Sequence, residues 1–113
     1  MLKESQINLF ITVDEKKLPE KIEWHADEAG FEGRKESQTV MLSLWDRKER
    51  MTYIIDLWTK DMNIEDMQIH FYQMFLKMAD TFERSTLNSD AAGMIRDFSS
   101  DFAKRIGIKD IPD

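Results

Sequence analysis

The feature that most constrains the fold is a single change in the spacing of apolar residues near Asp61. Before it, apolar side chains tend to recur at every second position, which is typical of β-strands. After it, they recur every three or four residues, which is typical of amphipathic helices. A run of strands followed by a run of helices predicts an α+β protein with an antiparallel sheet.

Four strands are predicted. A first strand is expected over residues 7–13, and a second begins at Pro19, which cannot donate a ladder hydrogen bond and suits a strand start. Residues 27–36 carry two glycines and many charges, so we expect a loop. The strands predicted over residues 37–45 and 51–59 flank a short charged turn, which indicates a β-hairpin. The four strands are expected to form one four-stranded antiparallel sheet with this hairpin at its centre.

Two helices are predicted, over about residues 64–85 and 89–106. Asn63 precedes the first helix and has Asp66 three residues later, which is a capping-box arrangement. Gly107 lies where the second helix is expected to end. The apolar stripes of the two helices consist of Ile64, Met67, Phe71, Met74, Met78 and Phe82 in the first, and of Ile95, Phe98, Phe102 and Ile106 in the second.

One sheet face is expected to lack a cover. Two helices can cover only one face, so we expect both to pack on the same face (ββββαα), while the hairpin strands are apolar on both sides. Because a monomer rarely leaves such a patch in water, a second copy of the chain (a homodimer) or another protein partner is expected there. The alternative is that sheet twist and the 27–36 loop cover these side chains. The possible interaction face consists of Met41, Trp45, Ile54 and Trp58.

The size and composition indicate one soluble domain. The chain has 113 residues, with the sheet expected over about residues 6–59 and the helices after it, which fits a single domain over residues 1–113. It has no long uncharged apolar run and no secretory signal pattern at its start, so we expect a cytoplasmic protein without direct membrane insertion. Sixteen Lys and Arg against 22 Asp and Glu give a net charge of -6, which argues against nucleic-acid partners.

No residue pattern predicts catalysis. The absence of cysteine excludes disulfides and thiolate nucleophiles. His25 lies near Asp27 and Glu28, but this spacing matches no established metal-ligand pattern. His70 adjoins the apolar stripe and is interpreted as a packing residue. We therefore predict that the protein is not an enzyme, with no catalytic residue, no metal and no cofactor.

Several segments resemble a known family. The segments LPEKIEW, VMLSLWD, IIDLWTKDM and MADTFERST, followed by IRDFSSDFAKRIGI, resemble the gliding-motility-associated GldC family in order and spacing, from about Gln6 to about Ile108. The resemblance implies a small cytoplasmic protein accessory to gliding motility and its associated secretion machinery. It implies no catalytic residue, cofactor or substrate. A non-enzymatic protein that acts by protein–protein interaction is therefore the leading functional hypothesis.

Two alternatives stay open at this point. The first is a small acidic chaperone or secretion adaptor that shields unfolded segments, which the eight methionines support because their flexible side chains adapt to different partners. The second is a small-molecule-binding or enzymatic domain with a cavity between sheet and helices. The residues expected to line that cavity are Phe71, Met74, Met78 and Phe98.

Overall fold

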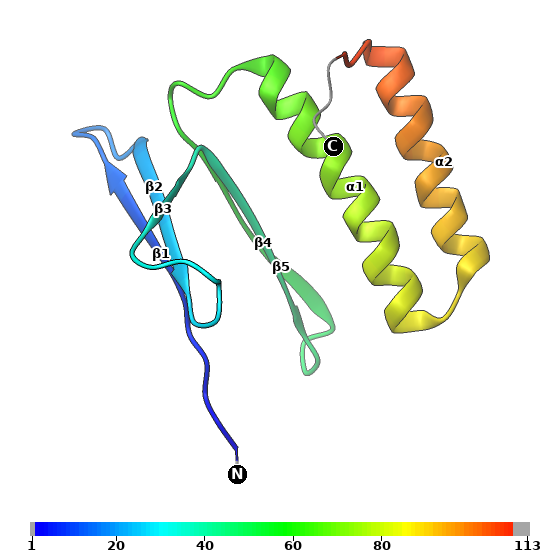
Figure 1. Cartoon of the computed structure of the whole chain (residues 1–113), viewed down its shortest axis with the longest axis horizontal. Helices are drawn as coiled ribbons and strands as arrows, with labels where there is room; N and C mark the ends of the chain where they lie inside the picture. Colours follow the sequence, from blue (N-terminus) through cyan, green and yellow to red (C-terminus); the bar gives the residue numbers. More distant parts are fainter. Residues whose placement is uncertain (1, 110–113) are drawn as a thin grey trace. The chain divides into compact units, whose positions relative to one another are not determined.

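The structure is a computed structural model that describes residues 2–109, in which five strands precede two helices (Figure 1). The chain divides into two compact units, the strands up to Met62 and the helices from Asn63 onward. The prediction of an α+β protein with two C-terminal helices is confirmed. Packing of the helices on one sheet face stays a prediction, and so does the single domain over residues 1–113, of which residues 1 and 110–113 lie outside the described residues.

The strand unit contains two antiparallel sheets. The first has the order β1 (Ile7–Val13), β2 (Pro19–Ala26) and β3 (Lys35–Ser37). The second is the hairpin of β4 (Thr39–Asp46) and β5 (Met51–Trp58). The hairpin was correctly predicted, but it forms a sheet of its own.

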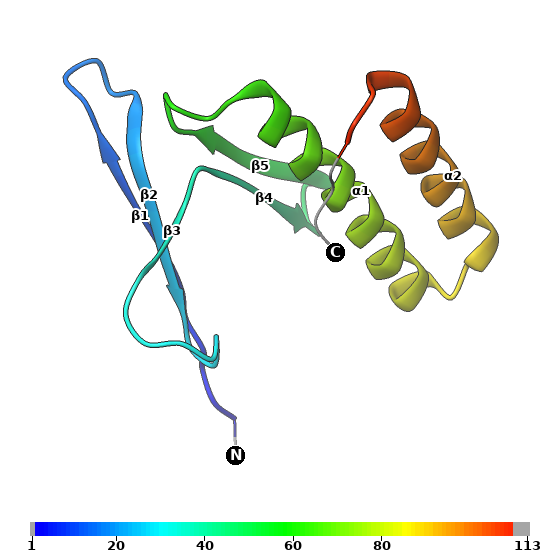
Figure 2. The same ribbon diagram turned by 45° about the horizontal axis from the view of Figure 1, so that its top comes forward.

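The prediction of one four-stranded sheet with the hairpin at its centre is therefore wrong. A bend at Gln38 divides the expected third strand into β3 and β4, and the Ser37 hydroxyl donates to the Thr39 carbonyl oxygen at 2.9 Å across it. On one side of the bend Ser37 pairs with Ile22 of β2, and on the other Thr39 pairs with Trp58 of β5. Figure 2 shows the sharp turn of the chain between the two strands. The expected 27–36 loop is also shorter, because β3 begins at Lys35.

The residues after β5 connect the two sheets at one end of the hairpin. The Thr59 backbone N–H donates to the Gln38 carbonyl oxygen at 2.8 Å, and the Lys60 N–H donates to the Pro19 carbonyl oxygen at 3.3 Å. Thr59 is only 3% exposed, and Ile22 of β2 is fully buried. These bonds fix the base of the hairpin to the three-stranded sheet.

The helix boundaries agree closely with the prediction. Helix α1 spans Ile64–Thr86 and α2 spans Ser89–Ile106. The Asn63 side chain accepts a 2.7 Å hydrogen bond from the Asp66 N–H, so the predicted N-cap is confirmed. Gly107 ends α2 in the left-handed conformation, at φ 71°, where a residue without Cβ has no steric penalty.

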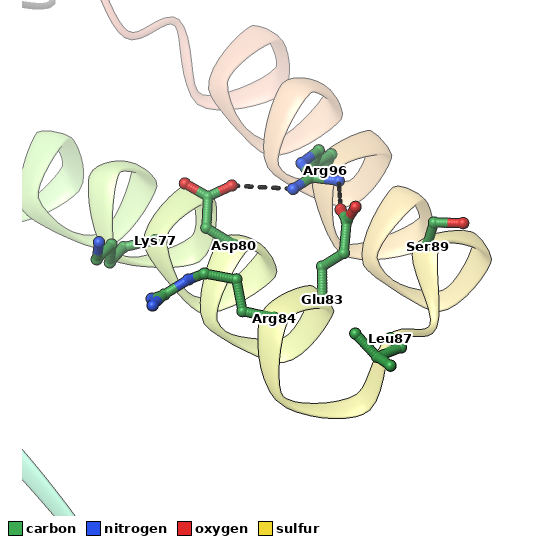
Figure 3. A pocket seen from close by; sticks show the side chains of 7 residues that line it. All are labelled: Lys77, Asp80, Glu83, Arg84, Leu87, Ser89 and Arg96. Carbon is green, nitrogen blue, oxygen red and sulfur yellow. Dashed lines mark hydrogen bonds and ion pairs between the residues drawn. The ribbon is translucent and has the colours of Figure 1, made fainter.

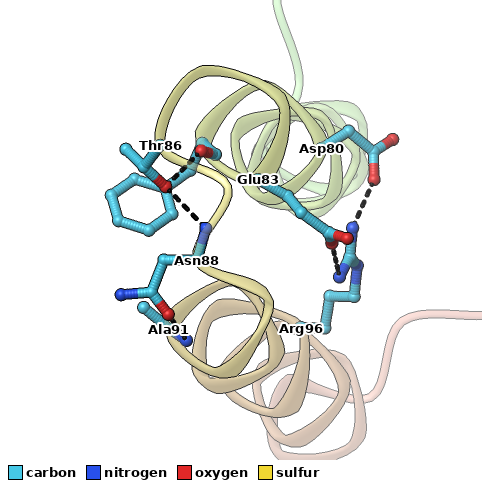
Figure 4. Close-up of polar contacts among 7 residues, drawn as sticks. Asp80, Glu83, Thr86, Asn88, Ala91 and Arg96 are labelled. Carbon is cyan, nitrogen blue, oxygen red and sulfur yellow. Dashed lines mark hydrogen bonds and ion pairs between the residues drawn. The ribbon is translucent and has the colours of Figure 1, made fainter.

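The two helices form an antiparallel hairpin that is closed by short polar contacts at the turn (Figure 4). Asn88 caps α2 by accepting from the Ala91 N–H at 2.9 Å, and its own N–H donates to the Thr86 hydroxyl at 3.2 Å. Farther along, small residues are buried in the unit, which is typical where helices approach closely. They are Ala79, Ala92 and Ser99.

The aromatic cluster of this unit centres on Phe75. Its ring packs edge-on against Phe71 of the same helix, with centroids 6.0 Å apart, and against Phe98 and Phe102 of α2 at 5.3 and 5.1 Å. Phe75 was not part of the predicted stripe. The stripe residues Ile64 and Met78 are instead exposed.

Candidate functional site

The four residues of the predicted interaction face lie on one face of the β4–β5 hairpin. Residues that pair directly across an antiparallel hairpin point to the same face. Met41 pairs with Asp56, Trp45 with Thr52, Ser43 with Ile54 and Thr39 with Trp58, and all eight positions share one side. We call this side the tryptophan face; it consists of Thr39, Met41, Ser43, Trp45, Thr52, Ile54, Asp56 and Trp58.

Large and small side chains alternate on the tryptophan face. Each cross-strand pair joins one large apolar residue to one smaller polar residue, and the large member changes strand from one pair to the next. The large residues therefore follow a zigzag along the ribbon. They are well exposed: Trp45 by 61%, Ile54 by 57%, Trp58 by 56% and Met41 by 44%.

The opposite face of the hairpin is apolar on both strands. Leu42 pairs there with Ile55, and Leu44 pairs with Tyr53. All four of these side chains are also exposed. An isolated two-stranded ribbon is marginally stable in water, so apolar side chains on both faces of this hairpin favour contact with another surface.

The charged turn of the hairpin is fixed by side-chain hydrogen bonds. The Asp46 carboxylate accepts from the Glu49 N–H at 2.7 Å, and Arg50 takes the left-handed conformation at φ 54°. The Tyr53 hydroxyl donates to Glu49 Oε1 at 2.7 Å, which raises the pKa of Tyr53 because the bond favours the neutral phenol.

An ion-pair cluster lies at the base of the hairpin. Lys60 Nζ is 2.8 Å from Asp14 Oδ2 and 3.2 Å from Glu20 Oε1. The hydrogen bond from Lys60 lowers the pKa of Asp14, and the same contact raises the pKa of Lys60. Asp14 also accepts from the N–H groups of Lys16 and Leu18, so its carboxylate holds the β1–β2 turn and the end of β5 together.

A second polar contact lies beside it. The Thr59 hydroxyl donates to Asp61 Oδ1 at 2.6 Å and lowers the pKa of Asp61. These contacts explain the geometry of the hairpin base without a ligand, because every carboxylate in them either accepts from a donor or faces water.

A shallow depression on the helical unit is lined by charged residues, as Figure 3 shows. Arg96 of α2 reaches Asp80 Oδ1 at 2.9 Å and Glu83 Oε1 at 2.7 Å on α1. These bonds lower the pKa of Asp80 and raise that of Arg96. The Arg96 guanidinium therefore joins the two helices through its two carboxylate partners, and Lys77 and Arg84 also line the depression.

Within the residues that the structure describes, neither histidine belongs to a metal-binding cluster. His25 lies edge-on to Phe31 with ring centroids 6.1 Å apart. His70 is half-buried on α1, its Nε2 has no hydrogen-bond partner, and burial lowers its pKa. Within residues 2–109, no group of three or more His, Asp or Glu side chains is placed to hold a metal ion.

The expected cavity between sheet and helices stays a prediction. Two of its four residues, Phe71 and Phe98, meet the same Phe75 ring, while Met78 is exposed. Neither α1 nor α2, within the part of the chain that the structure describes, is long and apolar enough to cross a membrane.

Comparison with known proteins supports the resemblance found in the sequence. Residues 19–108 match the family described as gliding motility-associated protein GldC-like. No curated protein and no solved structure matches the chain. The matched stretch begins at β2 and includes the whole β4–β5 hairpin and both helices.

Proposed function

Because the chain belongs to the GldC-like family of gliding motility-associated proteins, we propose that it is a non-enzymatic accessory protein of gliding motility or of its associated secretion machinery. It acts in the cytoplasm by binding another protein. This interaction depends on the tryptophan face of the β4–β5 hairpin.

The observation that carries this proposal is the exposure of Trp45 and Trp58 on one face of the hairpin. Tryptophan side chains supply a large share of the binding energy at protein interfaces, because they bury a large rigid surface at little entropic cost. The net charge of -6 is consistent with a soluble partner protein and unfavourable for a nucleic-acid ligand.

The proposal is tested by affinity capture from the native organism with the full chain as bait, followed by mass spectrometry. We expect the wild-type protein to capture a component of the gliding or secretion machinery from the soluble fraction. The Trp45→Glu variant, which places a charge in an apolar contact, is expected to lose that component.

The matched control is Ile7→Glu, which makes a similar apolar-to-acidic change at a 78% exposed position of β1, outside the hairpin. This variant is expected to capture the component as the wild type does, and far-UV circular dichroism checks that both variants are folded. Equal capture by folded Trp45→Glu, or capture of no such component by the wild type, contradicts the proposal.

A small acidic chaperone or secretion adaptor is the second candidate. Exposed apolar side chains on both faces of the hairpin favour it, because a client segment in an extended conformation can pack against either face. This candidate requires that the protein suppress aggregation of an unfolded client. A protein that captures one folded partner but does not suppress aggregation fits the first candidate alone.

A further inference from the structure

We infer that the protein which covers the tryptophan face is a second copy of this chain, stacked face to face as a homodimer. This inference rests on the proposed function: two copies paired through this face are the form that captures the component, so Trp45→Glu loses the dimer and the capture together. The observation that supports it is the pattern of large and small side chains on that face.

The tryptophan face is complementary to itself. A symmetric dimer uses the same patch on both copies, so that patch must fit its own rotated image. If two ribbons stack about a twofold axis parallel to the strands, β5 of one copy lies over β4 of the other. Trp58 then lies over the partner's Thr39, and Ile54 lies over the partner's Ser43, since these residues are paired within each hairpin.

The same exchange holds for the other two pairs. Trp45 lies over the partner's Thr52, and Met41 lies over the partner's Asp56. At every level of the stack, a large apolar side chain therefore meets a smaller one. An unrelated partner would need a surface shaped for this zigzag, whereas a second copy has it already.

The exposed area is enough for a weak dimer. From their exposed fractions, the four large side chains offer about 450 Å² per copy, since a tryptophan alone can bury up to about 250 Å². With the smaller residues between them, two copies would bury about 1,200 Å² in total, which is the lower end of specific interfaces. We therefore expect a dissociation constant in the micromolar range.

Asp56 is the one charged residue of this face, and it distinguishes a second copy from a basic partner. In the stacked dimer its carboxylate lies opposite an aliphatic side chain, which costs free energy because the charge loses water and gains no counterion. The Asp56→Asn variant removes the charge and keeps the shape. It is expected to tighten the dimer by about fivefold, whereas it would weaken binding to a partner with a Lys or Arg at this point.

The test is sedimentation velocity of the full chain from about 1 to about 200 µM, a range that spans a micromolar dissociation constant. The wild type is expected to change from monomer to dimer, Asp56→Asn to do so at lower concentration, and Trp58→Ala to weaken the dimer by about 30-fold. Ile7→Ala, on the other sheet, is expected to match the wild type. A wild type that stays monomeric throughout, or an Asp56→Asn variant that dimerises less, overturns the inference.

A cross-linking experiment gives an independent readout. Because the chain has no cysteine, Ser43→Cys places a single thiol in the middle of the face. Stacked sheets are about 10 Å apart, so a short bis-maleimide is expected to join two copies of this variant through the introduced thiols. The control variant Ile7→Cys is expected to give no cross-linked dimer, and equal cross-linking of both variants overturns the stacked arrangement.

The outcomes for the homodimer and for the proposed function can be told apart. If the chain stays monomeric but Trp45→Glu loses a captured component, only the homodimer is wrong. If the chain dimerises and captures no component of the gliding or secretion machinery, the accessory role is wrong.

Discussion

At the scale of single residues, Asp14 and Lys60 determine how the hairpin is attached. Their 2.8 Å ion pair connects the β1–β2 turn to the chain just after β5, and Glu20 contributes a second carboxylate at 3.2 Å. Surface ion pairs usually add little stability. Here the pair supports backbone hydrogen bonds that join two separate sheets, so we expect its loss to be measurable.

The Asp14–Lys60 pair should make stability depend on pH. The pKa of Asp14 in the folded protein is below its usual value of 3.8, so its contribution is present above that pH and is lost as the pH falls through the folded-state pKa. The pKa of Lys60 is raised above 10.5, so the contribution is also lost as the pH rises through the folded-state pKa of Lys60. Asp14→Asn, which keeps an oxygen for the turn N–H groups, is expected to lower the melting temperature at neutral pH.

The measurement is thermal unfolding of the wild type and Asp14→Asn at pH 7 and at about pH 2.5, which is closer to the lowered folded-state pKa of Asp14. The difference between the two proteins should shrink at the lower pH. Glu20→Gln, at the longer and more exposed contact, should show a smaller difference at pH 7. A difference of equal size at both pH values would mean that the ion pair is not its cause.

At the scale of secondary-structure elements, local signals made the helices predictable. The Asn63 cap, the Asp66 partner and Gly107 at the end of α2 all act within a few residues of the chain, so the sequence contains them completely. Phe75 was missed because its position depends on a contact that is distant in sequence. Which side of α1 meets α2 depends on how the two helices dock, and the 3–4 spacing of the other apolar residues indicated a neighbouring stripe.

The central position of Phe75 predicts unequal effects of two similar substitutions. Phe75→Ala removes the ring that contacts three other phenylalanines, and is expected to lower the free energy of unfolding by about 3 kcal/mol. Phe98→Ala removes a side chain that is 54% exposed and should cost clearly less. Chemical denaturation of both variants measures the difference; equal costs would show that Phe75 is not the centre of the cluster.

The strands were harder to predict than the helices because their pairing is not local. Nothing in Gln38 itself distinguishes a bend from a strand position. The change of partner at that residue, from β2 to β5, depends on contacts distant in sequence. The faces of the hairpin were nevertheless predicted correctly, because alternation along each strand is a local property.

At the scale of the whole molecule, the family and one exposed surface are considered together. Family membership associates the chain with gliding motility, and the hairpin contributes an exposed aromatic face. We expect Trp45 and Trp58 to face solvent in the single subunit and to become covered only when a partner binds.

The most direct measurement is acrylamide quenching of tryptophan fluorescence in a Trp24→Phe variant, whose emission comes from Trp45 and Trp58 alone. At about 1 µM, below the expected dissociation constant, we expect red-shifted emission that acrylamide quenches readily. Emission that is blue-shifted and protected from acrylamide in this dilute, monomeric protein would show that both tryptophans are buried within one subunit, and would contradict the account.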